Sequence, residues 1–266
     1  MQKKSNNTKL TRYLKYFFLN FYSKYSHVKT LLKKNFIAKS KTKKVLCRTC
    51  CLGNECLDLL KINNQIHFQK LRIDSFLNSE KYANNLEAFK FLKNFQIFDF
   101  INQLQINPFS IYRYKYIIFD SFSELVDSKF ILPNNKVFYA VKGDVRIDKL
   151  LSYGGKYESQ INLNNIKQIY LEVFQKLWEI YRCKIFFILC STKFDKRKFF
   201  KERSEIINEA IKNIAQEKEY LICIEPNEDF IEKSNQDNFP YHFNKKTILY
   251  FSDKLNLEIQ KIKLTN

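Results

Sequence analysis

The sequence predicts an α/β fold in which helices cover both faces of a mostly parallel sheet, giving three layers. Two observations lead to this prediction. Segments with helical periodicity alternate with short apolar runs through the C-terminal half of the chain. These runs, such as 184-KIFFILC-190, are uninterrupted rather than alternating. A strand buried on both faces requires such a pattern, and parallel sheets covered by helices contain strands of that kind.

The elements can be assigned in order along the chain. Apolar runs indicate strands, apolar spacings of three and four residues indicate helices, and Gly53 indicates a turn before the first helix of the domain. The expected strands are 44–47, 114–119, 184–190 and 220–224, and the expected helices are 54–61, 85–104, 163–182, 199–217 and 244–256. The central loop 131–162 carries no clear pattern.

The N-terminal residues 1–43 form a basic arm that differs from the α/β domain expected over 44–266. Residues 1–44 hold 13 Lys and Arg and no acidic residue, whereas the remainder holds 33 against 27. Apolar side chains recur every three or four positions over 10–32, which predicts an amphipathic helix. Such a helix can lie on an anionic membrane surface, or it can pack on its own domain with its lysines in water.

The cysteines and the apolar runs bear on location. Seven cysteines are present, and three of them lie in or beside predicted strands. An odd number placed in this way favours reduced thiols over a disulfide framework. No secretory signal or membrane-spanning run is visible. We therefore expect a cytoplasmic protein, with peripheral contact at the inner membrane through residues 10–32.

Few glycines and the spacing of the cysteines exclude several classes of site. With four glycines, neither a phosphate-binding P-loop nor a dinucleotide fingerprint can be built, which argues against kinases and nicotinamide dehydrogenases. Cys47 and Cys50 have zinc-like spacing, but a structural zinc site needs a second ligand pair, and His67 is distant. We expect no metal and no resident cofactor. These thiols are then either buried apolar groups or include a nucleophile at a helix N-terminus, where a thiolate is stabilised.

In a parallel sheet, ligands bind at the carboxyl ends of the strands. Three polar groups follow predicted strands and are candidates for that position. They are the Cys50–Gly53 turn, Asp120 with Ser121 and Ser123, and the Ser191–Asp195 loop.

Three short blocks carry a resemblance to a known superfamily. They are 49-TCCL-52, 117-IIFDSFSELVD-127 and 237-DNFPYHFNKKTILYFSDKL-255. In this order they resemble the SGNH (GDSL-type) hydrolases and acyltransferases, and within these the bacterial polysaccharide-biosynthesis branches with a cysteine in the first block. The resemblance covers roughly residues 44–256 and implies a flavodoxin-like core. The first block lacks the family glycine, and the acid stands five rather than three residues before the histidine.

The resemblance implies a catalytic set and a group of supporting residues. Cys51 would be the nucleophile, His242 the base and Asp237 the carboxylate that orients the imidazole. Thr49, Cys50 and Ser121 stay open as alternative nucleophiles. The residues expected to hold the oxyanion or substrate are Gly53, Asn54, Asp120, Ser121, Ser123 and Lys193.

The function implied is an esterase or O-acyltransferase acting on acyl esters of a surface polysaccharide, such as capsule or lipopolysaccharide, or of its precursor. A coenzyme A-linked donor could bind through the basic loop that contains Lys193, Lys196 and Arg197. One alternative is a non-catalytic protein of the same fold that binds a glycan or a partner. Another is a nucleic-acid-binding protein, which the concentration of charge in residues 1–44 disfavours.

Overall fold

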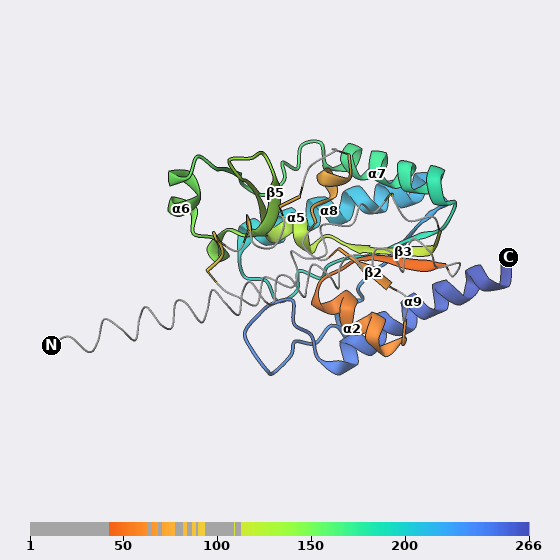
Figure 1. Ribbon diagram of the computed structural model, residues 1–266. Helices are drawn as coiled ribbons and strands as arrows, with labels where there is room; N and C mark the ends of the chain where they lie inside the picture. The colour runs from red at the N-terminus through yellow and green to blue at the C-terminus, as the bar shows by residue number, and fades with distance from the viewer. Residues whose placement is uncertain are drawn as a thin grey trace.

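The computed structural model describes residues 43–62, 65–68, 71–77, 82–83, 87–88, 90–93, 109 and 113–265 (Figure 1). The helix expected over 10–32, and with it almost all of the basic arm, lies outside the described residues. Most of the helical pattern at 85–104 lies outside them as well.

The central sheet has five parallel strands in the order β2-β1-β3-β7-β8. The strands are β1 (Lys44–Arg48), β2 (Gln65–His67), β3 (Tyr114–Asp120), β7 (Ile185–Ile188) and β8 (Leu221–Ile224). Numbered along the sheet, this is the 2-1-3-4-5 order of doubly wound folds, in which the direction of winding reverses between β1 and β3. Ligands in such sheets bind at the carboxyl ends of the strands beside that reversal.

Helices cover both faces of this sheet and confirm the predicted α/β fold with a mostly parallel sheet (Figure 1). The strands send alternate side chains to two separate cores, with Ile117 and Phe119 in one and Tyr116 and Ile118 in the other. The first core is closed by α7 (Ile166–Tyr181) and α8 (Lys198–Glu217), and the second by α2 (Cys51–Leu59) and α9 (Lys245–Thr265). Burial on both faces explains why the strands are uninterrupted apolar runs.

A second, antiparallel sheet is inserted between β3 and α7, in and just before the region 131–162 that carries no clear sequence pattern. Its order is β5-β4-β6, and the insertion consists of α5 (Phe122–Val126), β4 (Asp127–Ile131), β5 (Val137–Val141), η5 (Lys142–Asp144), α6 (Ile147–Ser152) and β6 (Lys156–Glu158). Phe130 and Phe138 stack across β4 and β5 with ring centroids 5.0 Å apart. These elements are too short for periodicity to identify them. Two further 3-10 turns, η1 (Ile73–Phe76) and η6 (Glu228–Phe230), lie in loops.

Several boundaries differ from those expected. Gly53 does not form a turn but lies within α2, which begins at Cys51. A Cβ at Gly53 would lie 2.4 Å from Thr49 Cβ, so the residue is needed for close packing of the helix on the strand end. The last helix extends to Thr265 rather than to 256, because Ile259 continues its buried stripe. Among the described helices, none is both long enough and apolar enough to cross a membrane.

Candidate functional site

The carboxyl ends of β1, β3 and β7 meet beneath the loop that follows β8. A small apolar cavity lies at this point, and the loop supplies two of the residues that line it. Its lining consists of Cys50, Leu52, Asp120, Ile188, Cys190, Tyr241 and Phe243. Segments distant in sequence therefore meet at the edge of the sheet where doubly wound folds place their ligands.

Asp120 joins the turns that follow β1 and β3. One of its carboxylate oxygens accepts the Cys50 N–H at 2.6 Å, and the other accepts the Phe122 N–H at 3.1 Å. Burial raises the pKa of Asp120, and these two N–H bonds oppose that effect. Because both oxygens are engaged by backbone, Asp120 is placed to fix the shape of the site rather than to exchange protons with a substrate.

A buried ion pair lies directly behind this junction. The Arg48 guanidinium donates to both oxygens of Glu124, at 2.7 and 3.0 Å, and neither side chain is more than 1% exposed. Glu124 also accepts from the Tyr170 hydroxyl at 2.8 Å and the Ile73 N–H at 2.7 Å. Arg48 donates further to the Asp120 carbonyl at 2.6 Å. The sequence analysis did not identify Arg48. The one feature that could have pointed to it is a cation directly after the predicted strand 44–47.

Thr49 is held by two neighbours that the sequence did not connect. Its hydroxyl lies 3.0 Å from His67 Nε2 and 2.8 Å from Asn54 Oδ1. The Thr49 N–H also donates to His67 Nε2 at 3.4 Å. Thr49 is 1% exposed, which places it behind the surface that a substrate can reach.

Asp237 and His242, which the sequence identified as a pair, are bonded in the structure. Asp237 Oδ2 lies 2.6 Å from His242 Nδ1. The hydrogen bond from His242 lowers the pKa of Asp237, and a second bond from the Phe239 N–H adds to this effect. The imidazole also packs on the Phe239 ring, with centroids 4.7 Å apart. The remaining nitrogen, Nε2, is thus the one that can act as a base.

The loop that carries this pair is fixed at both sides of His242. The His242 carbonyl accepts the Ser234 N–H at 2.9 Å, and the neighbouring Tyr241 hydroxyl donates to Asp195 Oδ2 at 2.7 Å. Asp195 in turn holds Arg197 through two hydrogen bonds, at 2.9 and 2.8 Å. The sequence did not indicate that the loop after β7 would support the histidine.

Glu55, in α2, has an electrostatic interaction with His242. The charge on His242 lowers the pKa of Glu55, although burial outweighs it and the net shift is upward.

The predicted nucleophiles differ in accessibility. Cys51 is partly exposed, whereas Cys50 and Ser121 are buried, and Ser121 donates to Cys190 Sγ at 3.5 Å. Burial raises the pKa of Cys50 well above its ordinary value, with the nearby Asp120 adding to the effect. A buried thiol of this kind is inert. Ser123, predicted as an oxyanion or substrate ligand, is also buried, at 3% exposure.

Lys193 is held by the protein backbone. Its ammonium group donates to the carbonyl of Ile231 at 2.9 Å and to that of Glu228. Two of its three donors are therefore used to tie the loop after β7 to the loop after β8. A contact of Lys193 with substrate or a coenzyme A-linked donor stays a prediction. Among the described residues, no group of three or more His, Cys, Asp or Glu is arranged to hold a metal ion.

Comparisons of this chain with protein-family models, with curated proteins and with solved structures find no match.

Proposed function

We propose that this protein is an SGNH-like hydrolase or acyltransferase that acts on acyl esters of a surface polysaccharide or its precursor. The observation that carries the proposal is the Asp237–His242 hydrogen bond of 2.6 Å, on a loop over the carboxyl ends of the parallel strands. A carboxylate bonded to one imidazole nitrogen leaves the other nitrogen to accept a proton, as in triad hydrolases.

Cys51 is the nucleophile in this proposal because it alone combines access with position. It is partly exposed, and it is the first residue of the nine-residue helix α2. The positive end of the helix dipole stabilises a thiolate there.

The reaction proceeds in two balanced steps. Cys51 Sγ attacks the ester carbonyl while His242 Nε2 takes the thiol proton, and the alcohol leaves with that proton. The acyl group is then bonded to sulfur as a thioester. Water or a sugar hydroxyl attacks the thioester, His242 takes its proton, and the thiol re-forms as the acid or new ester departs. Asp237 holds the imidazole tautomer throughout.

In this proposal the first N–H groups of α2 stabilise the oxyanion. Intrahelical bonding begins at Asn54, whose N–H donates to the Cys50 carbonyl at 2.9 Å. The N–H group of Gly53 precedes that bond, and the first N–H groups of a helix point out of its start. Donors of this kind stabilise developing negative charge in acyl transfer.

Hydrolysis of p-nitrophenyl acetate tests the proposal, with mass spectrometry of the quenched enzyme. We expect acetyl on the peptide that contains Cys51, and we expect His242→Ala to lower kcat/KM about a hundredfold or more. Cys51→Ala should abolish acetylation. Cys223→Ala is the matched control, because that thiol is also partly exposed but lies in β8. Unchanged turnover in Cys51→Ala and His242→Ala would reject the catalytic function and leave the non-catalytic, glycan-binding alternative.

A further inference from the structure

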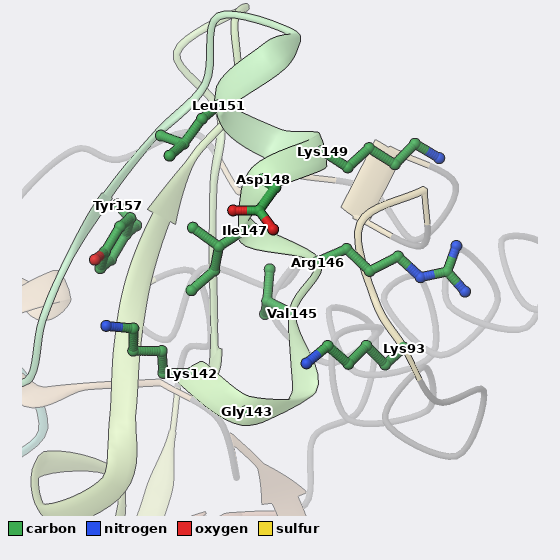
Figure 2. A pocket seen from close by; sticks show the side chains of 10 residues that line it. All are labelled: Lys93, Lys142, Gly143, Val145, Arg146, Ile147, Asp148, Lys149, Leu151 and Tyr157. Atoms are coloured by element: carbon green, nitrogen blue, oxygen red, sulfur yellow. The ribbon is translucent and has the colours of Figure 1, made fainter.

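One pocket of this protein is formed by the inserted antiparallel sheet and its short helix α6 (Figure 2). Its volume is about 820 Å³, which is within the range of small-ligand sites. The residues that line it come from η5, α6, β6 and the segment 90–93. The insertion follows β3 directly.

Positive charge dominates the lining of this pocket. Four cationic side chains, Lys93, Lys142, Arg146 and Lys149, line it together with one carboxylate, Asp148. Within the part of the chain that the structure describes, none of the four is in an ion pair. Like charges around a concave surface raise the local potential and attract anions.

The backbone fixes two of these cations relative to each other. Leu92 and Val145 form an antiparallel bridge, flanked by hydrogen bonds from Lys93 N–H to the Asp144 carbonyl at 2.8 Å and from Arg146 N–H to the Phe91 carbonyl at 2.7 Å. The segments that carry Lys93 and Arg146 therefore form one rigid wall. Mutual repulsion of cations held in this way is relieved when an anion binds between them.

The cations are spread around the pocket rather than converging on one point. In Figure 2 the Arg146 and Lys149 side chains extend in the same direction, whereas Lys142 lies on the other side of the chain beside Tyr157. The Lys142 ammonium group lies 5.1 Å from the centre of the Tyr157 ring. This spacing suits an extended ligand with several separate negative charges better than one compact anion.

Asp148 and Tyr157 indicate the chemical class of the groups that link the negative charges of such a ligand. A carboxylate repels phosphate groups but accepts hydrogen bonds from sugar hydroxyls. Tyr157, together with Leu151, which is 48% exposed, provides an apolar surface for a sugar ring. Single-stranded nucleic acids bind where several aromatic rings stack on successive bases, and Tyr157 is the sole aromatic residue among the described residues that line this pocket.

We propose that this pocket binds an acidic oligosaccharide, with its carboxylate or other acidic groups on the cations and its hydroxyls on Asp148. Its identification as the glycan part of the substrate rests on the proposed function. Binding itself does not depend on the Cys51–His242 chemistry, so the two can fail separately.

Calorimetric titration of the full-length Cys51→Ala protein at low ionic strength tests the proposal without turnover. The probe is tri-galacturonic acid, and uncharged maltotriose is the control ligand of similar size. We expect saturable binding of the acidic trisaccharide, at least about tenfold tighter than maltotriose. Equal affinity for the two, or no binding of the acidic probe, would overturn the proposal.

Single-charge variants locate the binding. Arg146→Gln and, as a second variant, Lys93→Gln should each weaken binding about tenfold, the loss expected for one charge-assisted contact. Lys201→Gln is the matched control, because it removes one exposed charge from α8 and leaves the pocket intact. An equal loss in Lys201→Gln would show general attraction to a basic protein and reject the pocket.

Asp148→Asn separates a glycan from a simple polyanion. An asparagine accepts hydroxyl protons less strongly than a carboxylate, so affinity for tri-galacturonic acid should fall in this variant. If affinity rises instead, Asp148 acts only by repulsion and the glycan assignment is wrong. Tighter binding of a short oligothymidylate than of the trisaccharide would likewise contradict it.

Discussion

The carboxyl edge of the main sheet and the pocket of the inserted sheet use their charges in opposite ways. At the edge, Arg48 and Glu124 are buried and bonded to each other, and both oxygens of Asp120 accept backbone N–H groups. Around the pocket, Arg146 and Lys93 are exposed, and among the described residues no carboxylate pairs with them. In the first region the charged side chains stabilise the fold, and in the second they are available to a ligand. The same contrast separates the neighbours Cys50 and Cys51, one buried and one accessible.

Thiol alkylation should give the largest contrast between interior and surface. Burial raises the pKa of Cys56, Cys183, Cys190 and Cys223 to about 12, and it also raises that of Cys50. At about pH 8 such thiols hold roughly a thousandfold less thiolate than an ordinary exposed thiol. Iodoacetamide followed by peptide mapping should therefore label Cys51 first. Labelling of Cys190 at the same rate as Cys51 would show that the reagent reaches the carboxyl edge of the main sheet.

Removing one member of the buried ion pair should cause the largest decrease in the free energy of unfolding. Glu124→Ala leaves the Arg48 charge buried without its carboxylate, which costs about 3–5 kcal/mol. Urea unfolding measures the effect. Glu217→Ala is the control, because it removes an exposed ion pair with Lys167 and should change stability little. Equal effects of the two variants would show that burial of the Arg48–Glu124 pair does not matter.

Gly53→Ala tests the close packing of α2 on the end of β1. The new Cβ would lie 2.4 Å from Thr49 Cβ, so the helix must shift, at a cost of about 1–3 kcal/mol. Gly143→Ala, in the inserted sheet, has no atom within 4 Å of its new Cβ and should be nearly neutral. Thermal unfolding of both variants measures the difference. A neutral Gly53→Ala would mean that α2 can move without strain.

Acid stability should show the smaller contribution of Asp195, which supports the loop of His242. Burial alone would raise the pKa of Asp195, but hydrogen bonds from Arg197 and Tyr241 outweigh it and lower the pKa below the ordinary 3.8. A carboxyl whose pKa is depressed on folding stabilises the protein above its unfolded pKa, and the contribution is lost as pH falls below it. Asp195→Asn should therefore flatten the loss of stability below about pH 4. If stability falls equally steeply below about pH 4 in Asp195→Asn, the Asp195 carboxylate does not contribute to the acid sensitivity.

The sequence predicted the sheet better than it predicted the site. The long apolar runs at β3 and β7 identified their strands because both faces of each strand are buried. The site could be predicted only where its members are close in sequence, as Asp237 and His242 are. Arg48 and Glu124 are 76 residues apart in the sequence, and Thr49 and His67 are 18 residues apart. The spacing of apolar residues within a short segment cannot predict such contacts.

The sequence by itself determined the layered α/β order, the pairing of Asp237 with His242 and the concentration of basic residues before residue 45. These properties are local, because they depend on spacing, composition and charge within short segments. Only the tertiary structure decided that Asp120 is used for backbone bonding, that Cys51 is accessible while Cys50 is not, and that residues from segment 90–93 and from η5 to β6 form one basic pocket. Burial and partner choice depend on which distant segments meet, and the winding of the chain around the sheet sets that.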